Sequence, residues 1–443
     1  MNNKKTLKKE ILLVIPNTSY SKIYHYEYYR HTPLESITRI SNLLEQYEYD
    51  VEIIDCREFK YSIKELVEFA KEYKFIGITT FFDSYSFIED FSKAVTKKNK
   101  DSIIIIGGPL ASSIPELFVD YTNIDFVIKG KGDIVLLNLL EYFYQNIFKK
   151  NNIKDRIFSI HNISEIARFN NIENYPLLNW DIYKDLKKKN FDYMYIASLG
   201  CQNKCSYCSN PNTSFKLTSV NNFEKELKYL INKWNLEVVL FNDSDFFQHP
   251  LFDSYLDILK DLKIKWGGFT RPEKLNKIKL RKAIESGCIN IRFGLESFDN
   301  EVLKSNFRNV NIADMNNALE MCFDSAIQKV TGSFVIGLYG ETKSSIKKTI
   351  NNIEKYPKLI PRAFSLIPLP GTHIFNLALK KNLISNEIKL IRDLKNCRLE
   401  LDDPIFINFT SMTNEELISV RQDIIGIMNE REKGVLNKCL IKV

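Results

Sequence analysis

The residues best suited to chemistry are three cysteines within eight positions, Cys201, Cys205 and Cys208. They follow the apolar run 193–197, so their spacing of C-x3-C-x2-C lies at the end of an expected strand. Thiolates this close can share one soft metal centre, but a structural zinc site takes four protein ligands and no fourth cysteine or histidine lies nearby. Three thiolates suit an iron–sulfur cube with one iron left open. Structural zinc, a disulfide and a chance cluster are the alternatives.

Composition places the chain among ordinary globular proteins. Its 443 residues are enough for two or three domains, and 44% of them are hydrophobic. No apolar run approaches the length of a membrane span, and the basic start leads only into the short segment 11–15, so we expect a cytoplasmic protein without a signal peptide. Eight cysteines, five of them scattered, make no disulfide scaffold in a chain of this length. The net charge of +7 falls on separated lysine runs, which we interpret as solvated faces, so nucleic-acid binding is disfavoured.

Short apolar segments alternate with amphipathic ones over residues 1–145, which predicts a doubly wound, Rossmann-like parallel sheet. The expected strands are 11–15, 51–55, 75–79, 103–106 and 126–128, and the expected helices are 34–45, 63–70, 87–96, 115–121 and 134–143. Such sheets bind ligands at the carboxyl ends of their strands. Small residues there let a bulky ligand approach the backbone, and we assign this role to Gly77, Gly107, Gly108, Gly130 and Gly132.

A second alternating series occupies residues 191–375 and predicts a partial (β/α)6 barrel. Its expected strands are 193–197, 238–241, 265–268, 289–293, 330–336 and 364–367. A parallel barrel forms its site at the carboxyl ends of its strands, which is where the three cysteines fall. The polar residues 146–190 are interpreted as a linker, and residues 376–443 as a mostly helical tail with a last helix over 414–430.

With Tyr207 just before the last cysteine, the triad resembles the motif of the radical S-adenosylmethionine (SAM) superfamily, whose fold is such a partial barrel. Segments 241–247, 290–297, 333–342 and 368–372 resemble later motifs of that family, with Tyr339 in place of a usual proline. The resemblance implies that the thiolates hold a [4Fe-4S] cluster and that SAM chelates its open iron. One electron from the cluster then cleaves SAM to methionine and a 5′-deoxyadenosyl radical.

The resemblance also implies which residues contact SAM. Arg271 follows an expected strand and suits the SAM carboxylate, because a guanidinium pairs carboxylates bidentately; a structural salt bridge is the alternative. The polar residues of segment 241–247 suit the amino group, with capping of the next helix as the alternative. The full set is Tyr207 near the adenine, Asn242, Asp243 and Asp245 at the amino group, Arg271 at the carboxylate, Glu296 and Ser297 at the ribose or methionine, and Phe334 and Ile336 flanking the adenine.

Residues 1–145 resemble the cobalamin-binding-type domain found ahead of many radical-SAM domains. The matching segments are 11–16, 49–55, 76–79, 106–109 and 130–133. The motif D-x-H-x-x-G, whose histidine ligates cobalt in many cobalamin proteins, is absent, as it commonly is in the radical-SAM branch. A corrin-binding domain and a Rossmann-like domain that packs without a cofactor are the two alternatives. A loop with five tyrosines, His25 and His31 is expected at this sheet edge, over a cofactor or against the barrel.

Together the two resemblances imply a cobalamin-dependent radical-SAM enzyme. The expected reaction is methyl transfer to an unactivated carbon of a natural-product or peptide precursor, because such a carbon has no lone pair with which to attack SAM. The alternative is a radical reaction without methylation, such as cyclisation, epimerisation, rearrangement or bond formation. The implied partners are a small-molecule or peptide substrate and an electron donor such as flavodoxin or ferredoxin.

Overall fold

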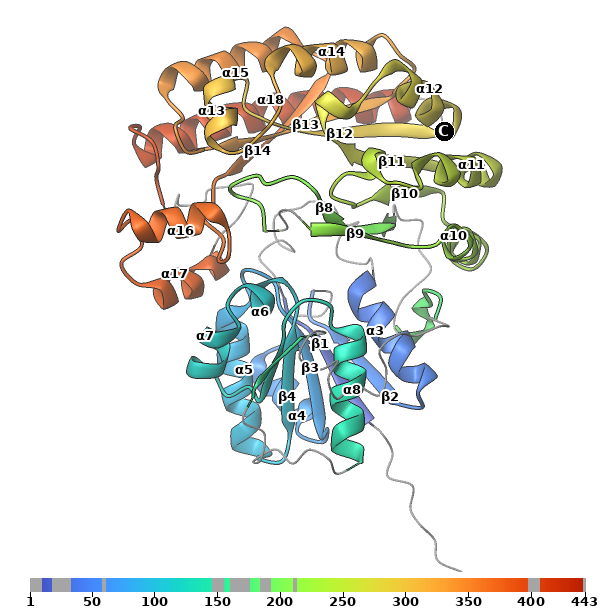
Figure 1. Ribbon diagram of the computed structural model, residues 1–443, viewed down its shortest axis with the longest axis vertical. Coiled ribbons are helices and arrows are strands. Elements are labelled where there is room, and N and C mark those ends of the chain that lie inside the picture. Colours follow the sequence, from blue (N-terminus) through green and yellow to red (C-terminus); the bar gives the residue numbers. More distant parts are fainter. Residues whose placement is uncertain are drawn as a thin grey trace, which may run out of the picture. The chain divides into compact units, whose positions relative to one another are not determined.

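The structure, a computed structural model, describes residues 10–17, 33–57, 61–145, 155–159, 176–183, 193–209, 213–396 and 407–440. The chain divides into two compact units (Figure 1). The first unit comprises residues 1–187 and 386–397, and the second comprises residues 188–385 and 398–443. The boundaries expected at 145, 190 and 375 therefore stay a prediction about domains, and the structure adds a C-terminal segment to the first unit.

The first unit is built on a six-stranded parallel sheet with the order β2-β1-β3-β4-β5-β6. Its strands are β1 (Glu10–Ile15), β2 (Asp50–Asp55), β3 (Phe75–Thr79), β4 (Ile103–Gly107), β5 (Phe126–Ile128) and β6 (Ile157–Phe158). Runs of β-branched residues buried on both faces produce such strands. The doubly wound fold is therefore confirmed. One detail was wrong, because β6 comes from the segment interpreted as a linker.

Helices cover both faces of this sheet. They are α3 (Glu35–Gln46), α4 (Ile63–Ala70), α5 (Tyr85–Lys98), α6 (Pro109–Ser113), α7 (Pro115–Tyr121) and α8 (Asp133–Tyr144). The alternation along β1 shows the two cores, since Leu13 packs with residues of α3 and α8 while Leu12 packs with residues of α4, α5 and α7. With both faces covered, the carboxyl ends of the strands are the edge at which such a sheet binds ligands.

Gly77 belongs to the core and not to the ligand edge. It lies in the middle of β3, paired with Leu13 on β1 and Ile105 on β4. A Cβ atom at Gly77 would lie 2.7 Å from the Leu13 side chain, so packing within the sheet requires the glycine. The prediction that Gly77 lines a cofactor site was wrong for this reason.

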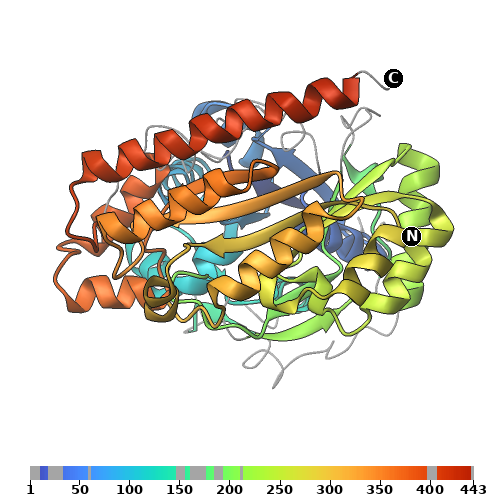
Figure 2. The ribbon, with the colours of Figure 1, turned by 90° about the horizontal axis from the view of Figure 1, so that it is seen from above.

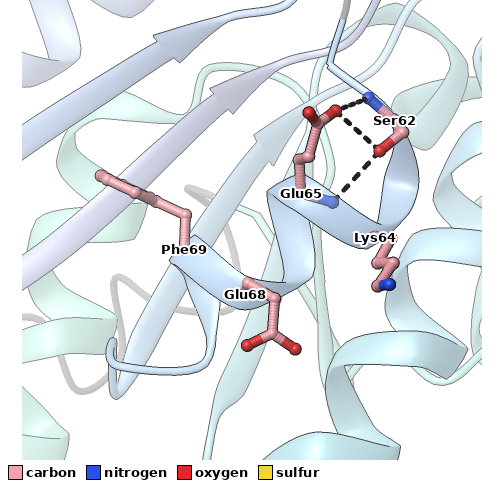
Figure 3. Close-up of a pocket in the computed structure, with 5 residues that line it drawn as sticks. All are labelled: Ser62, Lys64, Glu65, Glu68 and Phe69. Atoms are coloured by element: carbon pink, nitrogen blue, oxygen red, sulfur yellow. Dashed lines mark hydrogen bonds between the residues drawn. The ribbon is translucent and has the colours of Figure 1, made fainter.

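The outer surface of α4 shows how its sequence starts the helix. Ser62 and Glu65 form a capping box, in which the Ser62 hydroxyl accepts from the Glu65 N–H and the Glu65 carboxylate accepts from the Ser62 N–H (Figure 3). These residues line a shallow surface pocket together with Lys64, Glu68 and Phe69. Ser62 and Glu65 serve the cap, and Glu68 pairs with Lys71 and Lys98, so the polar groups of this pocket already have partners within the fold.

A short C-terminal helix, α17 (Glu387–Asp393), completes the first unit. Its Ile391 is fully buried in the same core as α4 and α5. Arg392 pairs with Glu89 on α5 through two contacts of 3.0 and 2.5 Å. The chain therefore returns to its N-terminal unit after the barrel has been built.

The second unit is a six-stranded parallel sheet with the order β14-β13-β12-β11-β10-β7. Its strands are β7 (Tyr193–Tyr195), β10 (Val238–Phe241), β11 (Lys265–Thr270), β12 (Cys288–Glu296), β13 (Lys329–Ile336) and β14 (Leu359–Ser365). The outer helices are α10 (Val220–Trp234), α11 (Phe252–Leu262), α12 (Lys277–Glu285), α13 (Asn300–Ser305), α14 (Ile312–Phe323), α15 (Lys343–Lys355) and α16 (His373–Lys380). The predicted six-stranded partial barrel is confirmed, with β7 and β14 at its two edges.

The last strand, β14, begins five residues before the start that the sequence predicted at position 364. Pro361 lies within β14, paired with Gly332, and a proline inside a strand argues against a central position. An edge strand tolerates it, because one side of the strand makes no ladder hydrogen bonds. The long helix α18 (Asn414–Leu440) runs along this edge (Figure 2).

An antiparallel ribbon leads from the first barrel strand into the cysteine loop. It consists of β8 (Ser198–Cys201) and β9 (Thr213–Leu217), with Cys201 opposite Thr213. The expected strand 193–197 extends two residues beyond β7, and neither strand of the ribbon was predicted. Among the described helices, none combines the length and apolar character needed to cross a membrane.

Candidate active site

Asp243 anchors the entry to the cysteine loop. Its carboxylate accepts the Ala197 N–H at 3.0 Å and the Ser198 hydroxyl at 2.5 Å, and it is 1% exposed. Asp243 follows β10, so this contact joins the first two barrel strands at their carboxyl ends. Both oxygens of Asp243 therefore hold the turn before Cys201, a role that differs from the predicted contact with SAM and from helix capping.

Ser206, between Cys205 and Cys208, is fixed by two other loops of the barrel. Its N–H donates to the Asn306 carbonyl at 3.1 Å and its hydroxyl to the Asn306 side chain at 3.0 Å. Its carbonyl accepts the Ile374 N–H at 2.9 Å. Asn306 in turn donates to the carbonyls of Val302 and Tyr339, each at 2.8 Å. The cysteine loop is thus tied to the loops after β12, β13 and β14.

Two buried guanidinium groups face the cysteine loop. Nη1 of Arg271 lies 3.7 Å from the Cys205 sulfur, and Nη1 of Arg308 lies 3.9 Å from the same atom. The Cys201 sulfur accepts from Asn203 at 3.3 Å. All three triad cysteines are half-buried.

The donor set fits a cluster better than a single ion. Within the described ranges, no three His, Cys, Asp or Glu side chains converge on one point as they would around one metal ion. A [4Fe-4S] cube requires a different arrangement, because each thiolate binds its own iron at a separate corner. Cys201, Cys205 and Cys208, on a loop held at both ends and in the middle, are the residues that suit it.

Glu296 ends β12 in a strained turn. Its φ of 68° lies in the left-handed region, and the Ser297 N–H donates to the Leu295 carbonyl at 2.8 Å across it, which forms a γ-turn. The carboxylate lies over Gly294, where a Cβ atom would be 2.7 Å from Oε1. Strain of this kind in a non-glycine residue persists where the surroundings impose it, and it concentrates at functional sites.

Burial and three neighbours set the charge state of Glu296. Burial raises the pKa of the Glu296 carboxyl, and the charges of Arg308 and Arg271 oppose that rise. Burial also raises the pKa of the Tyr207 hydroxyl well above its ordinary value, with Glu296 adding to the effect. The Arg308 guanidinium donates to the Gly294 carbonyl, and its pKa is raised by the negative groups around it. This alternation of charges beside the cysteine loop suits a zwitterionic ligand.

Asp245 is a buried carboxyl with no hydrogen-bond partner on either oxygen. It is 2% exposed and follows β10 directly. Burial raises its pKa to about 7, although the charge of Arg271 opposes the rise. A buried acceptor without a partner is costly, so this carboxyl suits a cationic donor from a ligand. It caps no helix, since the short turn that follows it receives no side-chain bond.

Arg271 already has one carboxylate partner. Its Nε bonds Glu273, two residues further on, and Arg271 is 6% exposed. The salt bridge that was the alternative interpretation is therefore present. The same guanidinium still directs Nη1 at Cys205, so the salt bridge orients it toward the loop. Contact of Arg271 with the carboxylate of SAM stays a prediction.

Several predicted SAM contacts lie elsewhere. The Ser297 hydroxyl is fully buried and lies 3.3 Å from the Thr349 hydroxyl on α15. Phe334 faces the same helix layer, because its ring packs 5.9 Å from that of Phe298. Ile336 shares that side of β13, whereas Val335 packs with Tyr207 on the inner side. Ser297, Phe334 and Ile336 are therefore packing residues, and Asn242 is exposed at the end of β10.

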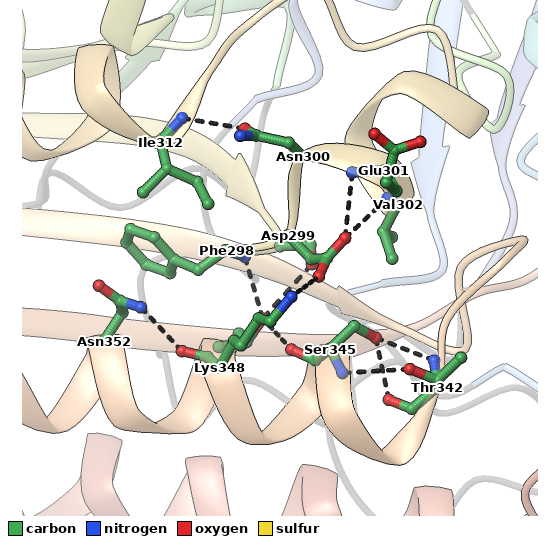
Figure 4. A network of polar contacts seen from close by, with 12 residues as sticks. Phe298, Asp299, Asn300, Glu301, Val302, Ile312, Thr342, Ser345, Lys348 and Asn352 are labelled. Carbon is green, nitrogen blue, oxygen red and sulfur yellow. Dashed lines mark hydrogen bonds and ion pairs between the residues drawn. The ribbon is translucent and has the colours of Figure 1, made fainter.

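Sequence reasoning missed Arg308, Asn306 and Ser206. Arg308 is 5% exposed and Asn306 is fully buried, although both lie in a polar stretch after the short helix α13. The start of this helix is held by Asp299, which accepts from the N–H groups of Glu301 and Val302 and pairs with Lys348 at 2.7 Å (Figure 4). A helix of six residues gives no apolar periodicity, so the sequence carried no signal for these contacts.

Four glycines line the strand ends of the first unit as predicted. Gly107 ends β4, and Gly108 has φ 102° with only 2.7 Å between a Cβ atom and the Thr80 carbonyl. Gly130 has φ 85°, and a Cβ there would meet nothing within 4 Å. Gly132 precedes α8. Of the four, only Gly130 has open space beside its backbone, while Gly108 is closely packed against Thr80; contact of these glycines with a ligand stays a prediction. The tyrosine-rich loop with His25 and His31 lies outside the described residues.

Comparisons with known proteins agree with both sites. The family model described as the Radical SAM superfamily matches residues 195–353, and the B12 binding domain matches residues 30–140. The chain contains a radical SAM domain preceded by a B12-binding domain. Its cofactors are accordingly a [4Fe-4S] cluster, SAM and cobalamin.

Relatives and solved structures extend this radical SAM assignment. An uncharacterised methyltransferase of Pyrococcus horikoshii is 26% identical over 364 residues, which cover 76% of each chain. An anaerobic magnesium-protoporphyrin IX monomethyl ester cyclase of Cereibacter sphaeroides is 21% identical over 88% of this chain and 65% of its own length. The structure of the radical SAM methyltransferase TsrM from Kitasatospora setae, with cobalamin and a [4Fe-4S] cluster bound, superposes with a TM-score of 0.65 at 14% identity, covering 85% of this chain and 79% of TsrM. That last likeness concerns the fold.

Proposed function

We propose that this protein is a cobalamin-dependent radical SAM methyltransferase that acts on an unactivated carbon of a natural-product or peptide precursor. One chain joins a B12-binding sheet, whose strand ends are lined with glycines, to a barrel whose cysteine loop faces buried charged groups. This combination is the observation that carries the proposal. Relatives named as methyltransferases support methyl transfer as the reaction.

The chain's own residues bind and orient the reactants. When bound, the cluster supplies the electron that cleaves SAM, and cobalamin supplies a carrier for the methyl group. Cys201, Cys205 and Cys208 hold the cluster, and the hydrogen bonds of Ser206 fix their loop. Asp245 receives the ammonium group of SAM, and Arg271 receives its carboxylate. Glu296, held over Gly294, accepts hydrogen bonds from the ribose or the methionine part, and Tyr207 lines the adenine.

A radical reaction without methylation is the second candidate. The observation that favours it is the cyclase relative, which matches 88% of this chain. In that case the same residues bind SAM, and the cobalamin of the B12-binding unit serves a different step.

Product analysis distinguishes the candidates. The full chain is reconstituted anaerobically with iron, sulfide and hydroxocobalamin, and incubated with SAM carrying a deuterated methyl group and with candidate substrates. Methyl transfer predicts a labelled product, whereas the second candidate predicts 5′-deoxyadenosine and an unlabelled one. Replacing Cys201, Cys205 and Cys208 together by Ala is expected to remove the cluster and all SAM cleavage. Cleavage by that triple variant would contradict both candidates.

A further inference from the structure

Phe307 is an exposed aromatic residue in a backbone conformation that suits glycine. Helix α13 ends in a Schellman motif, in which the Phe307 N–H donates to the Lys304 carbonyl at 3.1 Å and the Arg308 N–H to the Leu303 carbonyl at 2.9 Å. Phe307 takes the left-handed position of that motif with φ 59°, and it is 47% exposed. A left-handed conformation costs a non-glycine residue about 1–2 kcal/mol. An exposed ring gains little free energy from burial to offset that cost, so packing does not explain a phenylalanine at this position.

The residues before and after Phe307 both contact the cysteine loop. Its neighbour Asn306 holds Ser206, and its neighbour Arg308 lies 3.9 Å from the Cys205 sulfur. Its ring contacts the ring of the exposed His373, with centroids 4.7 Å apart. His373 precedes Ile374, whose N–H bonds Ser206. The exposed ring pair therefore lies next in sequence to Asn306, Arg308 and Ile374, three residues that contact the cysteine loop.

Exposed lysines lie on the same elements as this ring pair. Lys204 is exposed within the cysteine loop, and Lys304 is exposed in the last turn of α13. Lys380 is exposed seven positions after His373 on α16, which places both on the same face of that helix. The carboxylates of the same elements are Glu301, which is exposed, and Asp299 and Glu341, which are buried. The surface around the ring pair is thus net positive.

We propose that Lys204, Lys304, Phe307, His373 and Lys380, the Phe307 surface, bind an acidic flavodoxin-type protein that reduces the cluster. The proposal rests on the proposed function, which requires one electron for each cleavage of SAM. The reduced flavin gives up one electron and the cluster gains it. That electron then enters the bond between sulfur and the 5′-carbon of SAM, which breaks to methionine and the 5′-deoxyadenosyl radical. No other co-reactant is needed.

Charge and shape favour this occupant. A flavodoxin presents an apolar flavin edge within an acidic surface, and the Phe307 surface presents an aromatic ring within a basic one. Complementary charges of this kind steer association and fix the orientation of the partner. A ring held at a strained position beside the metal-binding loop gives the flavin edge an apolar contact at short distance from Cys205.

The variant Phe307→Gly separates docking from folding. Glycine suits the left-handed position, so this variant is expected to melt at or above the temperature of the wild type. Its iron content and its dithionite-driven formation of 5′-deoxyadenosine should stay unchanged, since dithionite needs no docking surface. With flavodoxin, flavodoxin reductase and NADPH as the electron source, the KM for flavodoxin should rise on the order of tenfold. Phe307→Asn, which also tolerates the left-handed region, serves as a second variant.

The charge part of the proposal is tested by Lys204→Gln and Lys304→Gln, with Lys260→Gln on α11 as the matched exposed control. The first two should raise the KM for flavodoxin and flatten its increase with ionic strength, whereas the control should change neither. Binding of oxidised flavodoxin at low salt, measured by calorimetry, should follow the same order and does not depend on turnover.

Three results would overturn the proposal. One is an unchanged flavodoxin KM and affinity in Phe307→Gly and both lysine variants. Another is an equal loss with dithionite and with flavodoxin, which would indicate a structural or SAM-binding role. The third is wild-type protein that dithionite activates but flavodoxin neither binds nor reduces, including the case in which only a ferredoxin serves. If dithionite itself produces no SAM cleavage, the proposed function fails, and the calorimetric comparison still decides the docking surface.

Discussion

A single carboxyl, Asp245, gives the site a pH dependence near neutrality. Its pKa is raised to about 7 by burial, so the folded protein binds a proton there that the unfolded chain releases at a much lower pH. As the pH rises through about 7, the carboxyl becomes charged, the ligand-free fold loses stability, and the attraction for an ammonium group grows. Three charged side chains also face this carboxyl. The charges of Arg271 and Lys279 lower its pKa, and the charge of Glu273 raises it.

We therefore expect SAM to bind more tightly at pH 8 than at pH 6, by up to about tenfold per pH unit below the pKa. The measurement is the dissociation constant of SAM by calorimetry across this range, beside thermal melting of the ligand-free protein. Asp245→Asn should remove the pH dependence of SAM binding and reduce that of melting, because Glu341 keeps its own contribution to stability. A pH profile that stays unchanged in Asp245→Asn would assign the titration to another group, of which Glu341, with a pKa also raised to about 7, is the first to test.

Sequence patterns locate residues on elements but do not fix which side of an element they face. The positions of Asp245, Arg271 and Glu296 at strand ends followed from strand–helix alternation. The inner side of β13 did not, because a parallel strand buried on both faces shows no clear alternation, and Phe334 was therefore assigned to the wrong side. Arg308 was missed because its contact with Cys205 joins residues 103 positions apart.

At the scale of elements, helix α15 holds the strained turn at Glu296. The Thr349 hydroxyl accepts the Phe298 N–H at 2.9 Å and lies 3.3 Å from the Ser297 hydroxyl. These contacts fix the two residues that follow Glu296. Thr349 is thus a positioning residue, since it acts on SAM only through the turn.

Replacing Thr349 by Val keeps the shape of the side chain and removes the hydroxyl. A buried N–H left without a partner costs about 1–3 kcal/mol, so the melting temperature should fall. The affinity for SAM should fall several-fold as the Glu296 turn relaxes, while the iron content stays near that of the wild type. Thr349→Ser should restore both quantities. Loss of stability with unchanged SAM affinity would show that Thr349 supports the fold alone.

The loop after α13 positions the cysteine loop through Asn306. Its side chain accepts one hydrogen bond and donates two, each with a buried or half-buried partner. Asn306→Ala should therefore accelerate loss of iron to a chelator and lower the iron content after reconstitution. The exposed neighbour Asn309→Ala is the control. Equal iron retention in the two variants would contradict this role.

Strand–helix alternation predicted most elements to within a few residues, including β3, β5, β10, α4 and α7. It failed where tertiary context overrides local pattern. Pro361 is acceptable only because β14 is an edge, and the β8–β9 ribbon exists only because the cysteine loop closes it. Neither condition is visible in a window of neighbouring residues.

At the scale of the whole molecule, the chain passes between its two units three times, near residues 187, 385 and 397. The middle excursion brings α17 onto the first unit, where Ile391 fills the core and Arg392 adds an exposed ion pair of little energetic weight.

Ile391→Ala is expected to destabilise the first unit by about 2–5 kcal/mol, because it leaves a cavity in the core beside α5. Denaturant titration should show the loss, and cobalamin should bind more weakly while reconstituted iron is unchanged. The exposed Lys389→Ala on the same helix is the control. Equal stability of the two variants would mean that α17 contacts the first unit without stabilising it.

The place of α17 in the chain also sets an order of events on the ribosome. The first 187 residues emerge about 200 residues before α17 does, a delay of roughly 10–40 s at ordinary rates of synthesis. During that time the apolar side of α5 lacks Ile391. We therefore expect the newborn first unit to stay less stable than the finished one until the barrel has been translated and α17 has docked.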